Sequence, residues 1–320
     1  MTSEAAKATR HAPRAGARTG ASAATGVKAP GIPTRLLVEA LVREDGSVDA
    51  GELYAVAAAL GMTDQQVRLC IKRLVAEGRF SHEGRGRRAV LRAVADASGA
   101  LAPDADFVRF AYRQDRGEAP WDGRWHLIAF AVPESQRPAR DALRDRLISL
   151  GAAPLQGGLY VTANDIGPYV GAAAVDLGIA SAVTTLTSTD LRVGGTSEPS
   201  ELAARLWPLQ EIAARYQDLA ALATDRLALV EAALGAGAGS GQLGAVQRLT
   251  YAVEAAAEFT RAMTPDPLLP PELLPAHWAG RRARALAAQL WQRLAELPAE
   301  PNEPRLFRLY TQGTEHASNP

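Results

Sequence analysis

The chain has 320 residues, 47 % of them hydrophobic and 22 % charged, and its 35 Lys and Arg residues balance its 35 Asp and Glu residues. This length and composition predict two or three globular domains with true hydrophobic cores. The sequence has no run of about 18 apolar residues, which argues against a membrane span. Its one cysteine, Cys70, excludes an internal disulfide and is expected to be a small core residue of a cytoplasmic protein.

The balanced net charge conceals an asymmetry along the chain. Residues 1–95 contain 15 Lys and Arg residues against 9 Asp and Glu residues, so the remainder is net acidic. A basic end joined to an acidic remainder indicates that a polyanion meets one end only. Residues 1–30 are rich in Ala, Gly, Thr and Arg without apolar periodicity, and we expect a disordered basic tail there.

Residues 31–95 are predicted to form three helices and a hairpin. The segments "PTRLLVEALVRE" (33–44) and "SVDAGELYAVAAALG" (47–61) repeat apolar residues at helical spacing. A third helix begins at Thr63, which forms a T-x-x-Q capping box with Gln66. The segment "RFSHEGRGRRAVLRAV" (79–94) then predicts two strands joined by a glycine-containing turn.

This order of elements is that of a winged helix-turn-helix domain, whose third helix enters the major groove of DNA. Glutamine pairs with adenine edges, and arginine pairs with guanine or phosphate. Basic side chains on the turn between the two strands suit the DNA backbone. The predicted DNA-binding residues are Thr63, Gln65, Gln66, Arg68, Lys72, Arg73, Arg79, His82, Arg85, Arg87 and Arg88.

Residues 96–120 are predicted to be a connector with a short helix near "PDADFVRFAYR", and residues 121–196 a small α+β domain. In that domain "WHLIAFAV" is an apolar run suited to a central strand, an amphipathic helix follows it, and "PLQGGLYVT" is taken as one strand. Another short helix and a strand, "SAVTTLTSTDLRV", complete the pattern. The order predicts a ferredoxin-like dimerisation domain.

Residues 197–300 are predicted to be a helical C-terminal domain, followed by a tail over residues 301–320. Pro208 should kink or interrupt the first long helical stretch. "GAGAGSGQLGA" (235–245) is typical of a flexible linker, and "TPDPLLPPELLP" (264–275) of a rigid corner between two further helices. The fold class is therefore α+β multidomain.

Three long segments resemble one known family, the PaaX-type transcriptional regulators, named for the repressor of phenylacetate catabolism. They are "LGMTDQQVRLCIKRLVAEGRF", "WDGRWHLIAFAVPESQRPARDALRDRLISLGAAPLQGGLYVT" and "DPLLPPELLPAHWAGRRARALAAQLWQRL". The resemblance runs from about residue 32 to residue 297 and implies a Cas2-like central domain. It also implies a homodimeric repressor whose affinity for a near-palindromic DNA operator falls when a small-molecule effector binds.

In the named members of that family the effector is an aryl-acyl coenzyme A thioester. On fold analogy, Trp121, Trp125 and Trp278 are candidate effector-binding residues between the central and helical domains. Core or corner packing is the alternative role for each of them. The segments "LGAAP" and "AVLRAV" depart from the family pattern, so the effector need not be the same.

Two alternatives remain beside an effector-controlled repressor, namely a metal-dependent nuclease acting through the central domain and a ligand-independent architectural DNA-binding protein. The nuclease needs converging carboxylates, but the first strand ends "AFAVPES" without an Asp, and Glu134 follows a proline. The chain has no G-x-S-x-G, G-x-x-x-x-G-K-[ST] or H-E-x-x-H motif. We therefore expect a nucleoid-associated cytoplasmic protein with no catalytic residue, metal or cofactor.

Overall fold

A computed structural model describes residues 33–43, 45–94, 107–235 and 243–297. The two predicted tails, the part of the predicted connector before residue 107 and most of the predicted linker at 235–245 lie outside these residues. None of the helices among them is long and apolar enough to cross a membrane.

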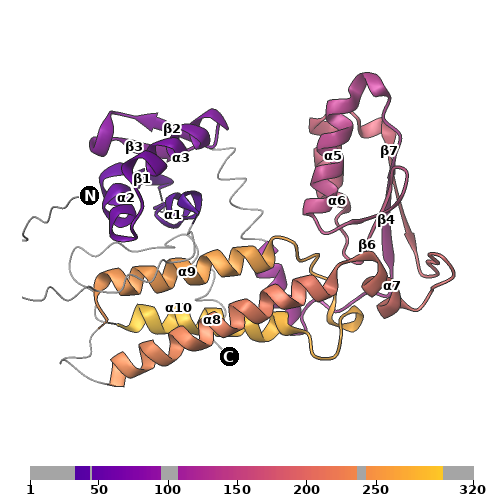
Figure 1. Cartoon of the computed structure of the whole chain (residues 1–320). Helices are drawn as coiled ribbons and strands as arrows, with labels where there is room; N and C mark the ends of the chain where they lie inside the picture. Colours follow the sequence, from indigo (N-terminus) through magenta and orange to yellow (C-terminus); the bar gives the residue numbers. More distant parts are fainter. Residues whose placement is uncertain (1–32, 44, 95–106, 236–242, 298–320) are drawn as a thin grey trace, which may run out of the picture. The chain divides into compact units, whose positions relative to one another are not determined.

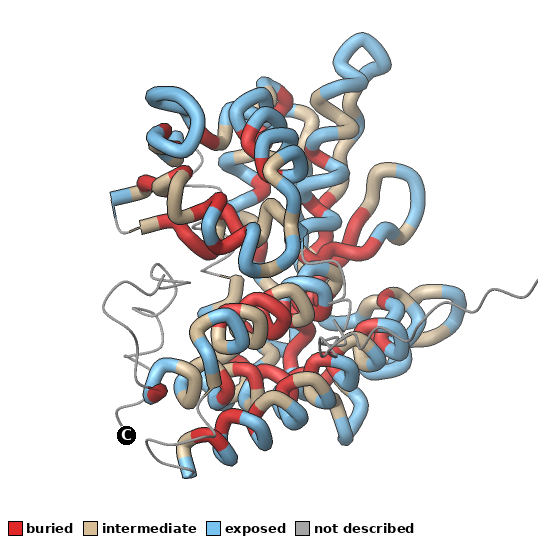
Figure 2. The backbone as a smooth tube through the Cα atoms, turned by 60° about the vertical axis from the view of Figure 1, so that its left-hand side comes forward, coloured by how far each residue is buried: buried red, intermediate tan, exposed pale blue. Residues whose placement is uncertain are grey.

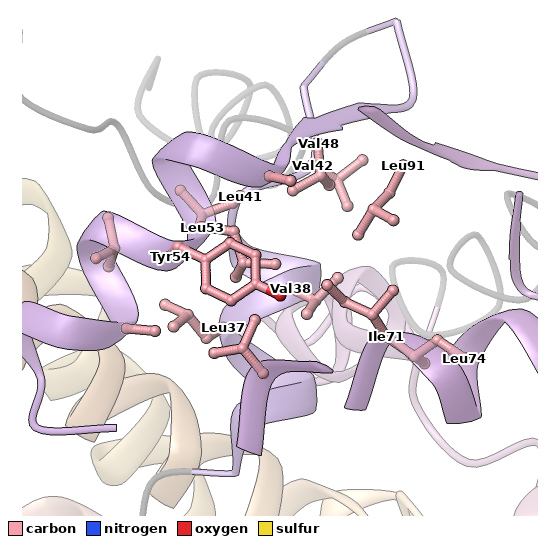
Figure 3. Close-up of a cluster of buried hydrophobic side chains, with 14 of the residues drawn as sticks. Leu37, Val38, Leu41, Val42, Val48, Leu53, Tyr54, Ile71, Leu74 and Leu91 are labelled. Atoms are coloured by element: carbon pink, nitrogen blue, oxygen red, sulfur yellow. The ribbon is translucent and has the colours of Figure 1, made fainter. Parts of the chain in front are cut away.

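Residues 33–94 form three helices and a three-stranded antiparallel sheet (Figure 1, indigo). Their order is α1 (Thr34–Ala40), β1 (Ser47–Asp49), α2 (Ala50–Ala59), α3 (Asp64–Ala76), β2 (Phe80–Glu83), the 3-10 turn η1 (Gly86–Arg88) and β3 (Val90–Ala93). The strands pair in the order β1-β3-β2. Side chains from all three helices and from the sheet meet in one core, in which Leu37, Leu53, Ile71 and Leu91 are prominent (Figure 3).

The prediction of a helix over residues 47–61 was wrong at its start. Ser47–Asp49 is a strand, and Val48 pairs with Leu91 of β3. The helix begins only at Ala50, where the side chain of Asp49 caps it by accepting a hydrogen bond from the backbone N–H of Glu52 at 2.8 Å. Helical periodicity did not reveal this strand because three residues are too few to display alternation.

The central part has the order β4 (Trp125–Phe130), α5 (Arg137–Ser149), β5 (Ala153–Gln156), β6 (Leu159–Thr162), α6 (Gly167–Asp176) and β7 (Val183–Ser188). Its strands are antiparallel and lie in the order β5-β6-β4-β7. This β-α-β-β-α-β succession is ferredoxin-like. The predicted single strand "PLQGGLYVT" is in fact two strands, because Gly157, at a φ of +55°, turns the chain back at a Gly-Gly pair.

Both faces of the central strand β4 are covered, which explains its continuous apolar run. Ile128 packs with Leu143 and Leu147 of α5 on one face. On the other face Trp125 and Leu127 pack in a second cluster. Residues of that cluster come from α7 (Pro199–Leu206) and from the 3-10 turn η4 (Pro271–Leu273), among other segments.

Three long helices make up most of the C-terminal part, namely α8 (Leu209–Gly235), α9 (Ala245–Met263) and α10 (Ala279–Glu296). They lie side by side (Figure 1), and their buried residues recur at helical spacing (Figure 2). The helical stretch breaks between α7 and α8 at Trp207 and Pro208, as predicted. The proline-rich corner lies between α9 and α10, also as predicted.

A buried charge network lies beneath that corner. The guanidinium group of Arg284 in α10 donates to both carboxylate oxygens of Asp115, at 2.7 and 2.6 Å, and to the hydroxyl of Tyr216 at 2.8 Å. The Tyr216 hydroxyl in turn donates to Asp266 at 2.5 Å. The side chains of Arg284 and Asp266 are each only 4 % exposed, so their charges are compensated by each other and by these hydrogen bonds.

The corner is also bound to the central part of the chain. The carbonyl of Leu268 accepts hydrogen bonds from the side-chain amides of Gln114 at 2.8 Å and Asn164 at 2.9 Å. At Gly151, whose φ is +84°, a Cβ atom would lie 2.6 Å from the carbonyl oxygen of Pro267. Only glycine permits that approach without displacement.

We predict that Arg284→Ala lowers the free energy of unfolding by about 3–5 kcal/mol, because it leaves the buried Asp115 and Asp266 unpaired. Burial already raises the pKa of Asp266. A carboxyl group whose pKa is raised in the folded state binds a proton more readily there than in the unfolded state. Lowering the pH therefore stabilises the folded variant, and the loss of unfolding free energy caused by Arg284→Ala should become smaller as the pH falls. Urea unfolding between pH 7 and pH 5 checks both effects.

The matched control is Tyr216→Phe, which keeps the arginine and removes one hydroxyl. Its expected cost is about 1–3 kcal/mol, because the hydrogen bonds of this buried hydroxyl to Arg284 and Asp266 are lost. Equal losses for the two variants would contradict a network centred on the arginine.

Candidate nucleic-acid interface

The helix α3 has a well-defined start and one buried face. The Thr63 hydroxyl accepts a hydrogen bond from the Gln66 backbone N–H, and the Gln66 side chain accepts one from the Thr63 backbone N–H at 2.7 Å, which confirms the predicted capping box. Val67, Ile71 and Leu74 are buried. The remaining face of α3 is therefore fixed in orientation and open to solvent.

The turn between α2 and α3 is tight. Gly61 follows α2 with a φ of +75°, a conformation that favours glycine, and the Met62 N–H returns to the carbonyl of Ala57 at 2.8 Å. Three residues thus separate the end of α2 from the start of the α3 capping box.

The predicted DNA-binding residues come from two segments that the fold brings together. Six of them lie on α3 or at its N-cap, and five lie between its end and the end of η1. Gln65, Gln66, Arg68, Lys72, Arg73, His82, Arg85, Arg87, Arg88 and Thr63 are exposed, and Arg79 is half-buried.

Asp64 links the two segments at the start of α3. Its Oδ2 atom lies 3.9 Å from Nη2 of Arg68 and 3.4 Å from Nη2 of Arg87. The Arg87 guanidinium also lies over the ring of Tyr54, 5.6 Å from its centroid, a cation–π geometry. The Arg87 side chain therefore connects η1 with α2 and α3. Sequence patterns did not single out Tyr54 or Asp64, because the turn reaches them only in the folded chain.

The basic side chains fall into two groups. Arg79 pairs with Glu39 at 3.7 Å and Glu77 at 4.0 Å, and Arg92 pairs with Glu83 at 3.1 Å. In contrast, a second group forms no ion pair with any described residue, and this group comprises Lys72, Arg73, Arg85 and Arg88. Their exposed, uncompensated charges give α3 and η1 their positive character.

Other predicted residues have local roles. The side-chain oxygen of Gln66 accepts a hydrogen bond in the helix cap. Pairing with an adenine edge would need this same oxygen. Cys70 is half-buried, and burial raises the pKa of its thiol, as expected of a packing residue rather than a nucleophile. It lines a groove of about 400 Å³ between the start of α1 and α3, together with Leu69 and Arg73.

The three tryptophans proposed for an effector pack against neighbouring rings. Trp125 is 2 % exposed, with Trp207 stacked at 6.3 Å and Trp121 edge-on at 5.5 Å between centroids. Trp278 lies edge-on to Tyr216 at 6.0 Å. Core packing accounts for these contacts, and the assignment to an effector stays a prediction.

Glu134, the first carboxylate after β4 in the sequence, lies in a 3-10 turn before α5. It accepts a hydrogen bond from Arg140 at 2.8 Å and lies 3.5 Å from Arg137. Within the described ranges, no three His, Cys, Asp or Glu side chains gather in an arrangement that could hold a metal ion.

Comparison with known proteins finds models of one family over most of the chain. Residues 32–96 match the model of a PaaX-like protein, residues 118–203 match the PaaX protein central Cas2-like domain, and residues 207–301 match the PaaX-like protein C-terminal domain. The chain is 26 % identical over 273 residues to the transcriptional repressor PaaX of Escherichia coli K12, covering 84 % of this chain and 81 % of the relative.

A solved structure is also similar, that of an uncharacterized protein from Mycobacterium tuberculosis. It is 22 % identical, with a TM-score of 0.45, and the match covers 83 % of this chain and 98 % of that one. The three successive family matches span most of the chain, and each contains one of the three segments that carried the resemblance in the sequence. The chain belongs to the PaaX-type regulator family.

Proposed function

We propose that the chain is a sequence-specific DNA-binding transcriptional repressor, and that residues 33–94 are its winged helix-turn-helix domain. The observation that carries this proposal is the pair of basic segments, α3 and η1, held together through Asp64. The family membership and the repressor name of the Escherichia coli relative support it.

In this proposal α3 lies in the major groove and η1 lies along the backbone. Arg68 and Gln65 contact base edges, since they lie in the first half of α3. Lys72, Arg85 and Arg88 contact phosphates, because their charges are not compensated by neighbouring carboxylates. Arg87 positions η1.

The proposed repressor is a homodimer, with the ferredoxin-like part as the dimerisation domain. A two-fold dimer presents two copies of α3 to half-sites separated by whole helical turns. The edge strand β7 supports this assignment, because it has an unpaired side in the sheet and exposes 46 % of Leu186.

A small-molecule effector, an acyl-coenzyme A thioester by family analogy, releases the dimer from its operator. A ligand-independent architectural protein would bind the same DNA without this response. Titrating acyl-coenzyme A thioesters into the operator complex separates the two, since only a ligand with different affinities for the free and bound forms changes operator affinity.

The first test is recovery of genomic fragments by the purified full chain, followed by sequencing at several salt concentrations. A repressor should enrich an inverted repeat that persists as salt rises. Diffuse and steeply salt-dependent recovery would contradict sequence-specific binding.

We predict that Arg68→Ala weakens binding to the recovered operator by about 1–3 kcal/mol and leaves binding to random DNA nearly unchanged, because a base contact is lost. Fluorescence anisotropy on both duplexes measures the difference. Equal losses on the two would remove Arg68 from base recognition.

The double variant Arg85→Ala with Arg88→Ala should weaken both kinds of binding alike. Each lost phosphate contact lowers the slope of log affinity against log salt by about 0.9, so the double variant should lose about 2. The matched control is Arg92→Ala, which removes an arginine already paired with Glu83. A slope change as large in the control would show that total charge, and not η1, sets the affinity.

A further inference from the structure

One apolar side chain stands on the outer face of α3. Leu69 is 49 % exposed, the largest exposure of any large hydrophobic residue described between residues 33 and 94. It lies two positions from each of the buried residues Val67 and Ile71. At about 100° per residue, it is therefore turned roughly 160–200° away from both.

Basic and amide side chains surround this leucine. Gln65 lies one turn before it on the same face, and Lys72 and Arg73 lie one turn after it. Lys72 and Arg73 form no ion pair with any described residue. A partner that covers Leu69 must therefore also accept two positive charges, which favours a polyanion over an apolar protein surface or a lipid chain.

Duplex DNA offers an apolar group within such a polyanion. The 5-methyl group of thymine lies in the major groove, between phosphate backbones, and is contacted by apolar side chains. We propose that Leu69 is a specificity-determining residue that contacts a thymine methyl group in the operator. This proposal rests on the proposed function, and it adds an apolar contact to the polar contacts assigned to α3.

The test uses the full chain and an operator selected by the wild-type protein from a random duplex library. Each thymine is replaced in turn by deoxyuridine, which lacks only the methyl group. Burying one methyl group contributes about 0.8 kcal/mol, or about fourfold in affinity. We expect one thymine in each half-site at which the replacement weakens wild-type binding about three- to fivefold.

Leu69→Ala should bind the thymine and deoxyuridine duplexes equally at that position. The variant keeps a strong helix former at an exposed site, so α3 remains folded. Val75→Ala is the matched control, because Val75 is also exposed on α3, at 37 %, but lies one to two turns further from the helix start. This control should keep the wild-type preference for thymine.

The outcomes are distinguishable. If no thymine shows an effect, or if Leu69→Ala keeps the thymine preference, the methyl contact is wrong while the proposed function stands. If the wild-type chain selects no preferred sequence, both the proposed function and this inference are overturned.

Discussion

Arg284 compensates the buried charges that hold the C-terminal part together. It joins α10 to Asp115 in the helical segment 107–115 and to Tyr216 in α8, and through Tyr216 to Asp266. A buried charge needs both an opposite charge and hydrogen-bond partners, and this network supplies both to Arg284 and Asp266. One guanidinium group therefore links segments that are distant in the sequence.

The network is connected to the proline-rich corner at residues 264–275. Asp266 receives the Tyr216 hydroxyl and also the backbone N–H of Leu268 at 2.8 Å. Leu268 has a φ of +50°, which is costly for a leucine, and its carbonyl is held by Gln114 and Asn164. Pro267 packs against Gly151. The corner thus connects the segment 107–115, the central part and α8 through contacts of its own backbone and of Asp266.

Ion pairs also position arginines among residues 33–94, but there the pairs lie at the surface. Glu39, Asp64, Glu77 and Glu83 neutralise some of these arginines and fix their positions, while Lys72, Arg73, Arg85 and Arg88 keep uncompensated charges. Exposed ion pairs contribute little to stability, so the pairs with these four carboxylates mainly orient the arginine side chains. A polyanion gains most from the second group, since no existing ion pair must be broken.

The sequence alone determined the helices that carry strong local signals, and it did so because those signals act between neighbours. The capping box of Thr63 and Gln66, the break at Pro208 and the outward side chains of α3 were all predictable in this way. The basic segments and the family were also identifiable from sequence. The short strand at Ser47–Asp49 and the turn between β5 and β6 were not, because each depends on pairing with a distant or reversed strand. Only the tertiary structure decided that Arg87 fastens η1 to Tyr54 and Asp64, and that Arg284 meets Asp115 across 169 positions. Such contacts join side chains whose separation along the chain carries no pattern, so they are set by packing and not by local preference.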